Sequence, residues 1–324
     1  GGWTCRDTAE EFAAYAAAVH ARLGDRVAIW TTLNEPWCSA FLGYASGVHA
    51  PGRRDPVAAF AAVHHLLLGH GLATQALRAA GARPISITLN PDPVYPADPD
   101  SAADQAATRV VDGLKNRIFY DPVLRGRYPA DMLEIMSRYG TAYLADGDER
   151  IIGEPIDLLG INYYTPRYVA AQVGAEPSPA YPGTGGIRFL PAAQPVTATN
   201  WQIAPSGLIA VLERIKHDYP GVPVLVTENG AAFDDPPAAD KQGLVTDPDR
   251  IAYLDGHVRA AHEAIARGID LRGYFVWSLM DNFEWAEGYR KRFGIVHIDY
   301  DTQRRTIKES GRWYRELIRR NGLG

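Results

Sequence analysis

Cysteine is scarce in this chain of 324 residues, in which only Cys5 and Cys38 occur. Their spacing fits no metal-binding or redox motif. A chain of this length can bury a sizeable core without cross-links, so no disulfide framework is expected. The cysteine content therefore favours the reducing cytoplasm as the compartment of the protein.

Excess positive charge and long apolar runs are also lacking. The formal net charge is -5 and the sequence pI is about 6.0, which leaves no basic footprint for nucleic acid or for an anionic membrane. No uninterrupted apolar run approaches the roughly 20 residues that cross a bilayer. The first residues, GGWTCRD, lack the charged and apolar regions of a signal peptide. We expect a soluble protein with neither nucleic-acid nor membrane partners.

Phosphate-binding and metal-binding motifs are missing as well. No strand-like run is followed by a dinucleotide-binding glycine fingerprint, and PGTGGI at 182–187 precedes neither Lys-Ser/Thr nor a helix. His64, His65 and His70 fall on one expected helix, but no two of them have the i, i+4 spacing that pairs zinc ligands. We expect no metal and no cofactor.

Apolar, β-prone runs alternate regularly with helix-like segments along the chain. The run VAIWTTLN, for example, follows an amphipathic segment in which Thr8 and Glu11 have the spacing of a helix capping box. Helices are expected at 8–23, 57–80, 101–119, 205–218 and 247–267. Strands are expected at 27–34, 85–90, 156–164, 222–229 and 271–279.

Near-continuous apolar strands separated by helices indicate an α/β fold with a parallel sheet. Two architectures compete, an open doubly wound sheet and a (β/α)8 TIM barrel; the missing glycine fingerprint disfavours the first. Barrel chemistry sits where the strands end, and polar or aromatic residues gather there. These strand-end residues are Asn34, Glu35, Asn90, Asn162, Tyr163, Tyr164, Glu228, Asn229, Trp277, Asp281, Asn282, Glu284 and Trp285.

Five strands cannot close a barrel of eight, and the first expected unit begins with a helix. The sequence therefore predicts one domain over residues 1–324 that is an incomplete TIM barrel. We expect strands 4 to 8 with their helices, and about three strands to be missing from the front.

Glu35 and Glu228 end two different strands and would face one mouth of such a barrel. Two facing carboxyl groups are the minimal apparatus for glycoside hydrolysis, one as proton donor and the other as nucleophile or base. A lone strand-end glutamate is more often a solvated loop residue. The pairing of two such residues within Asn-rich strand ends, with Trp277 and Trp285 nearby to stack on a sugar, favours the catalytic interpretation.

The motifs TLNEPW and VTENG resemble glycoside hydrolase family 1, the β-glucosidases and their relatives. GGWTCRDTAEEF is similar to the segment before the fourth barrel strand of that family, and LLGINYYTPR to its sixth strand. YFVWSLMDNFEWAEGYRKRFGIVHIDY is similar to its eighth strand and the hairpin that follows. The resemblance covers essentially the whole chain and implies a retaining β-glycosidase.

Residue roles follow from this resemblance. It implies that Glu35 is the general acid/base and Glu228 the nucleophile, and that Asn34 binds the sugar 2-hydroxyl. Tyr164, with Asn162 beside it, would hydrogen-bond Glu228 and keep that carboxylate ionised.

The same resemblance implies a second group of substrate-binding residues. Trp277 would form the stacking floor under the sugar, and Glu284 with Trp285 would hold its outer hydroxyls. Phe293 would close that end of the pocket, and Trp201 would be the aglycone-side platform.

Relatives that cleave phosphorylated glycosides replace the glutamate corresponding to Glu284, and thioglucosidases lack the one corresponding to Glu35. Because this chain keeps both, a plain β-O-glucoside is expected, with tolerance for galactose or fucose and for oligosaccharides. The family patterns QxE and HWDLP, which supply further sugar ligands, are absent. Three alternatives stay open: an inactive fragment or subunit that needs a complementing N-terminal segment, a homo-oligomer, and a carbohydrate-binding protein without catalysis.

Overall fold

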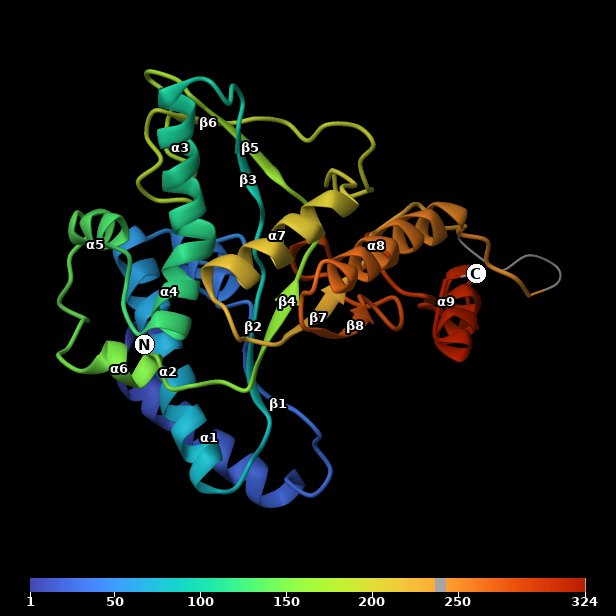
Figure 1. Cartoon of the computed structure of the whole chain (residues 1–324), viewed down its shortest axis with the longest axis horizontal. Helices are drawn as coiled ribbons and strands as arrows, with labels where there is room; N and C mark the ends of the chain where they lie inside the picture. Colours follow the sequence, from blue (N-terminus) through green and yellow to red (C-terminus); the bar gives the residue numbers. More distant parts are fainter. Residues whose placement is uncertain (237–242, 324) are drawn as a thin grey trace.

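A parallel β-sheet forms the centre of the computed structural model, which describes residues 1–236 and 243–323. Its strand order is β1-β2-β4-β7-β8, and every neighbouring pair is parallel (Figure 1). The expected strands and the α/β class with a parallel sheet are confirmed. The five strands are β1 (Trp30–Asn34), β2 (Ile85–Leu89), β4 (Leu158–Asn162), β7 (Val224–Asn229) and β8 (Leu271–Val276).

The sheet is open within the described residues, with β1 and β8 as its edges. All residues of β2 and β4 are buried, whereas the edge strands are partly exposed; Phe275 in β8 keeps 55% of its surface. The described strands therefore do not close a barrel by themselves.

Helices cover the sheet, with α1 and α2 beside β1 and with α7 and α8 beside β7 and β8 (Figure 1). Four of the expected helices agree with the structure to within one residue at each end. The fifth, expected at 101–119, is wrong as one helix: a π-helical turn, η3, interrupts it, and the helical run continues to Arg125. The bounds are α1 (Asp7–Leu23), α2 (Pro56–Ala79), α3 (Ala102–Asp112), η3 (Gly113–Arg117), α4 (Ile118–Arg125), α7 (Pro205–Asp218) and α8 (Pro248–Ala266).

The helix α2 is apolar because it is a core helix. Asp55 caps it by accepting a hydrogen bond from the Ala58 amide at 3.1 Å, and Pro56 occupies its first turn. By length and composition it could cross a membrane, but 89% of its most apolar window is buried inside the fold. Burial against the sheet and α1 accounts for that composition.

The capping box expected at Thr8 and Glu11 is wrong. The helix α1 starts one residue earlier, at Asp7, and its N-cap Arg6 makes no capping hydrogen bond. The Thr8 hydroxyl instead donates to the Gly2 carbonyl at 2.7 Å, because a preceding 3₁₀ turn places that carbonyl within reach.

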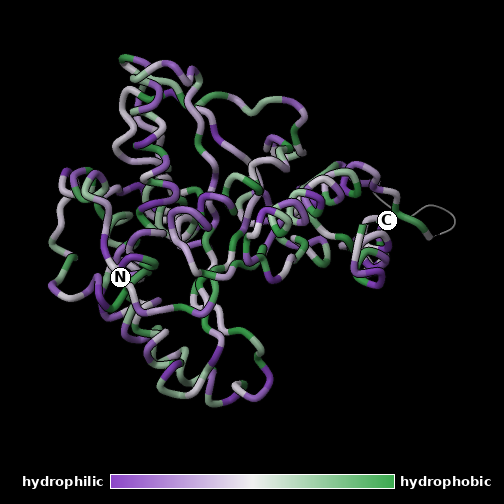
Figure 2. Tube along the Cα trace, in the orientation of Figure 1, coloured by the Kyte–Doolittle hydropathy of each residue, from purple (hydrophilic) through white to green (hydrophobic). Residues whose placement is uncertain are grey.

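Short strands and helices lie in the connections between the main strands and helices. A three-stranded sheet of order β3-β5-β6 lies beside α3, and β9 pairs antiparallel with β10. Figure 2 shows mainly hydrophilic residues along the peripheral helix α9. The remaining elements are η1 (Gly2–Thr4), η2 (Cys38–Ala45), β3 (Val94–Pro96), α5 (Ala130–Ser137), α6 (Asp148–Ile152), β5 (Arg167–Ala171), β6 (Ile187–Phe189), η4 (Trp285–Glu287), β9 (Val296–Ile298), β10 (Arg305–Ile307) and α9 (Glu309–Arg320).

Candidate active site

The carboxyl ends of β1, β4 and β7 bring the two predicted catalytic glutamates into one polar cluster. Asn34 ends β1 and Glu35 follows it, with its amide donating to the Thr88 carbonyl at 3.0 Å. Asn162, the last residue of β4, is in register with Glu228 on β7. Parallel strands present their ends at the same edge, so these side chains converge.

Asn162 links the two sides of the cluster. It is 1% exposed, and its amide Nδ2 donates to Glu35 Oε1 at 2.7 Å and to Asn34 Oδ1 at 3.0 Å. Its Oδ1 accepts a hydrogen bond from the Thr227 hydroxyl at 2.7 Å. The Asn162 amide is thus fixed in one orientation, with its donor directed at the Glu35 carboxyl group.

Glu228 is held from two other sides. The Tyr164 phenol donates to Glu228 Oε2 at 2.6 Å, and Asn34 Nδ2 lies 3.4 Å from Oε1 as a donor. Asn34 therefore contacts both Asn162 and Glu228, and the chain of contacts Glu35–Asn162–Asn34–Glu228 is continuous.

Burial, followed by the nearby Glu35 charge, raises the pKa of Glu228 to about 7. Hydrogen bonds from Tyr164 and Asn162 act in the opposite direction. The expectation that Tyr164 keeps Glu228 ionised has the correct direction, but the two raising effects are larger. Burial and the neighbouring charge therefore disfavour the ionised form of Glu228 more than these hydrogen bonds favour it.

Aromatic rings line the side of the cluster next to Tyr164. The Trp201 ring lies 5.1 Å from the Tyr164 ring and 6.0 Å from the Phe293 ring, measured between centroids. Phe293 is buried, with 2% of its surface exposed. The structure thus brings Trp201 and Phe293 to the predicted nucleophile.

Glu284 and Trp285 come from the segment after β8. Burial raises the pKa of Glu284 to about 7, with a hydrogen bond from Trp277 acting in the opposite direction. Glu284 Oε2 is buried and has no hydrogen-bond partner among the described residues. Such an unpaired acceptor is costly unless a ligand hydroxyl satisfies it. Trp285 is 66% exposed, so it stands at the rim of the site.

Three contacts of the site escaped sequence reasoning. Cys38, which has a raised pKa because it is buried, donates its thiol to Glu35 Oε2 at 3.1 Å. The His49 ring stacks on Trp285 with centroids 5.8 Å apart, and Thr227 orients Asn162. Of these contacts, only the one made by Cys38 could have been predicted from the sequence. Cys38 lies three residues after Glu35 and begins the helical segment η2.

The buried histidines of α2 have ordinary partners. His64 contacts Asp148 Oδ2 at 2.8 Å and Tyr128 at 3.1 Å, and His65 contacts the Trp3 carbonyl at 3.0 Å. Over residues 1–236 and 243–323 there is no group of three or more His, Cys, Asp or Glu side chains that could hold a metal ion.

Known proteins match the chain over its whole length. The family model "Glycosyl hydrolase family 1" matches residues 1–323. Thermostable beta-glucosidase B of Thermobispora bispora is 52% identical over 324 residues, which are 100% of this chain and 65% of that protein. The bifunctional beta-D-glucosidase/beta-D-fucosidase of Bifidobacterium breve is 46% identical over 98% of this chain and 70% of its own length.

Solved structures agree with this result. The psychrophilic beta-glucosidase BglU from Micrococcus antarcticus superposes with a TM-score of 0.93 and 48% identity, over 99% of this chain and 71% of its own. A beta-glucosidase from Thermotoga maritima in complex with deoxynojirimycin gives a TM-score of 0.92 and 42% identity, over 99% and 70%.

The chain spans 65% to 71% of the length of these relatives. The absence of about three strands stays a prediction. The family itself is shown by a model that matches residues 1–323 and by a relative 52% identical over the whole chain: the protein belongs to glycosyl hydrolase family 1.

Proposed function

We propose that the protein hydrolyses β-O-glycosidic bonds of β-glucosides by a retaining double displacement. The observation that carries the proposal is the half-buried carboxyl pair, in which Asn162 binds Glu35 and Asn34 bridges to Glu228. The names of the relatives, which include β-glucosidases and a β-D-fucosidase, support glucosides as substrates, with fucosides as further ones.

In the first step the ionised Glu228 carboxylate attacks the anomeric carbon while Glu35 protonates the departing glycosidic oxygen. The anomeric C–O bond breaks and a glycosyl ester forms on Glu228. In the second step Glu35, now ionised, takes a proton from water as that water attacks the same carbon and releases Glu228. Two inversions give net retention.

The neighbouring residues have distinct roles in this proposal. Asn34 binds the sugar 2-hydroxyl, a contact that strengthens in the oxocarbenium-like transition state. Tyr164 orients Glu228 and offsets part of the effect of burial on its pKa. Asn162 orients the acid/base.

The aromatic residues and Glu284 would form the walls of the sugar pocket. Trp277 is the stacking floor, and Glu284 with Trp285 binds the outer hydroxyls. Trp201 is the platform for the aglycone, and Phe293 closes the pocket beside it. The unpaired Glu284 Oε2 supports this assignment, because a sugar hydroxyl would supply its missing donor.

The test is the Glu228→Ala variant on an aryl β-glucoside. Turnover should be lost, and azide should restore part of it by attacking from the vacated face, so that the product is the α-glycosyl azide. The matched control is Glu134→Ala, which removes an exposed glutamate paired with Arg138. Ordinary activity in Glu228→Ala would overturn the proposal.

A second candidate is a chain that is inactive until further strands complete it. The open edges β1 and β8 of the described sheet and the lack of the QxE and HWDLP patterns motivate it, but relatives that match the whole chain do not favour it. The purified chain is assayed alone and with a family segment containing those patterns. Activity of the chain alone refutes this candidate.

A further inference from the structure

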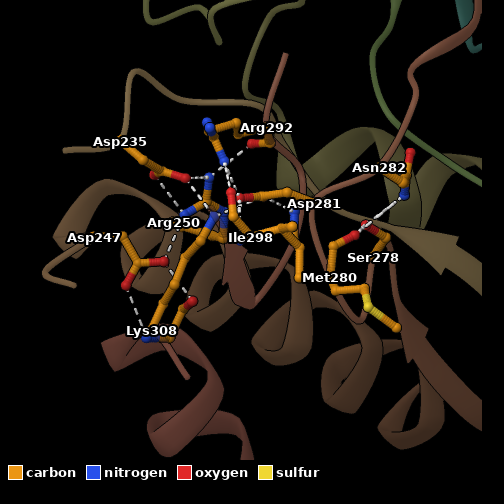
Figure 3. A network of polar contacts seen from close by, with 12 residues as sticks. Asp235, Asp247, Arg250, Ser278, Met280, Asp281, Asn282, Arg292, Ile298 and Lys308 are labelled. Carbon is orange, nitrogen blue, oxygen red and sulfur yellow. Dashed lines mark hydrogen bonds and ion pairs between the residues drawn. The ribbon is translucent and has the colours of Figure 1, made fainter. Parts of the chain in front are cut away.

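Figure 3 shows a network of charged residues around Asp281, which lies three residues before Glu284 in the chain. Its carboxylates are Asp235, Asp247 and Asp281, and its cations are Arg250, Arg292 and Lys308. Three negative and three positive groups balance. None of these residues was predicted as part of the site except Asp281, which was noted only for its place after a strand.

Asp281 is the centre of this network and is saturated with donors. Its two oxygens accept hydrogen bonds from Lys308 Nζ at 2.9 Å, Arg292 Nη1 at 2.7 Å, and the amides of Gly294 at 3.0 Å and Ile298 at 3.3 Å. Its side chain is fully buried. The Asp281 carboxylate therefore accepts four hydrogen bonds, all from residues that follow Trp285 in the chain.

These contacts close the base of a loop, 282–292, that carries Glu284 and Trp285. Backbone hydrogen bonds run from Asp281 to Val296 at 3.0 Å and from Ile295 to Ser278 at 2.9 Å. The two backbones are so close that a Cβ on Gly294 would lie 2.1 Å from the Asp281 nitrogen, which excludes any side chain there. The two ends of the loop are thus held together by these hydrogen bonds and by the close backbone contact at Gly294.

The network also joins this loop to the one that follows Glu228. Lys308 is fully buried and bridges Asp281 and Asp235, which lies seven residues after Glu228 in the chain. Arg250, 1% exposed on α8, binds Asp235 at 2.8 Å and the Arg292 carbonyl at 2.9 Å. Asp235 after β7 and the base of the loop after β8 are therefore joined to each other and to Lys308, the residue before α9.

Such a buried network of charges contributes little net stability to the fold. Desolvation of buried ions offsets most of their attraction, and well-packed apolar residues often serve equally well. What a densely paired network provides is a single geometry, because loss of any member leaves a buried charge without one of its partners. Here that geometry holds Glu284 with an unpaired, buried Oε2, which a loose loop would release to water.

We infer that Asp281, held by Lys308 and Arg292, is a positioning residue that fixes Glu284 against the loop after Glu228 and so determines selectivity for the outer hydroxyls of the sugar. The inference rests on the proposed function. Its consequence is selective: loosening the loop weakens recognition of the hydroxymethyl end of glucose and spares sugars that lack this group.

The test compares an aryl β-glucoside with an aryl β-xyloside, which has no hydroxymethyl group. For Asp281→Asn, kcat/KM on the glucoside should fall about tenfold or more and kcat/KM on the xyloside by less than about threefold. The matched control is Asp270→Asn, an exposed carboxylate paired with Arg272 at the opposite end of β8, which should leave both values unchanged. Equal losses on the two substrates in Asp281→Asn would overturn the inference, because a merely destabilised chain loses active enzyme for both.

Folding and positioning are separated by the double variant Asp281→Asn with Lys308→Met. Lys308→Met alone leaves two buried carboxylates short of a cation, whereas the double variant restores charge balance. The melting temperature of the double variant should recover toward the wild-type value, while the loss of glucoside selectivity persists. Recovery of selectivity together with stability would show a purely structural role and overturn the inference.

Binding without turnover distinguishes this inference from the proposed hydrolysis. Calorimetry gives the Kd of deoxynojirimycin and of its analogue without the hydroxymethyl group, and the wild type should prefer the former. Asp281→Asn should lose that preference even if neither protein has hydrolytic activity, in which case the proposed hydrolysis fails and the inference stands. A wild type that binds both equally, or binds neither, overturns the inference.

Discussion

The Tyr164 phenol donates a hydrogen bond of 2.6 Å to Glu228 Oε2, and this contact acts against two larger influences on the same carboxyl group. Burial and the Glu35 charge raise the pKa of Glu228 to about 7, and the Tyr164 bond lowers it. The ionisation of Glu228 is therefore set by a balance that single substitutions can shift.

Tyr164→Phe removes the phenolic donor and nothing else of the ring. The pKa of Glu228 should rise further, so the acid limb of the pH profile of kcat/KM should move to higher pH. A hydrogen bond to a charged group is worth about 1.5 to 3 kcal/mol, so kcat/KM should fall roughly tenfold to a hundredfold. Tyr15→Phe, on an exposed tyrosine of α1, is the control. An acid limb that moves to lower pH would contradict the account.

Glu35→Ala should affect substrates according to their leaving groups. A phenol that is stable as an anion departs without protonation, so a dinitrophenyl glucoside should still form the glycosyl-enzyme. An alkyl glucoside needs the proton and should lose roughly 100-fold or more in kcat/KM. Steady-state kinetics over a series of aryl leaving groups measures this dependence. A uniform loss across the series would show that Glu35 is not the acid.

Asn162→Asp would place a carboxyl group beside Glu35, where the amide now donates at 2.7 Å. A like charge disfavours ionisation of its neighbours, so protons should be held more tightly by the carboxyl cluster. We expect kcat/KM to fall at least about tenfold at pH 7, with partial recovery above the wild-type optimum. Asn321→Asp is the control, since Asn321 is an exposed residue at the end of α9. An unchanged pH optimum in Asn162→Asp would count against the cluster.

Stability should depend on pH through His64 and Asp148. Bonds to Arg6 and His64 outweigh burial and lower the pKa of Asp148 to about 2, so its contribution is complete above the unfolded value of about 3.9 and is lost as pH falls toward 2. Burial lowers the pKa of His64, so the unfolded chain takes up the extra proton first as pH falls through about 6.5. Both effects reduce stability on the acid side.

Asp148→Asn should reduce the free energy of unfolding at pH 7 by about 2 kcal/mol, because Arg6 and His64 lose a charged partner. The loss should shrink toward pH 2 in urea titrations. Asp270→Asn removes the partner of the exposed Arg272 and serves as the control. Equal losses for the two variants would contradict the assigned role of the buried pair.

The sequence allowed the sheet to be predicted because each central strand is a short apolar run that ends in polar residues, as at Leu33–Asn34 and Ile161–Asn162. The strands β3, β6, β9 and β10 were missed because three residues cannot show a period. The break in 101–119 was missed because Gly113 followed by Leu114 continues a helical pattern, and only packing decides that a π-helical turn forms there.

Strand-end position was sufficient to predict that Glu35, Asn162 and Glu228 lie close together. The position of a residue at a strand end does not determine the orientation of its side chain. Asn162 directs its amide nitrogen to Glu35 because its oxygen is held by Thr227, a residue on the neighbouring strand. The network around Asp281 was invisible for the same reason, since Asp235, Arg250 and Lys308 are far apart in sequence and meet only in the fold.

The central claim is that Glu228 forms a covalent bond with the sugar. The direct measurement is mass spectrometry of peptides after treatment with dinitrophenyl 2-deoxy-2-fluoro-β-glucoside, whose fluorine slows the second step and traps the glycosyl-enzyme. The account predicts one added fluoroglucosyl group, on the peptide that contains Glu228 and on that carboxyl group. A label on another residue, or steady turnover of glucosides by a chain whose Glu228 never becomes labelled, would contradict it.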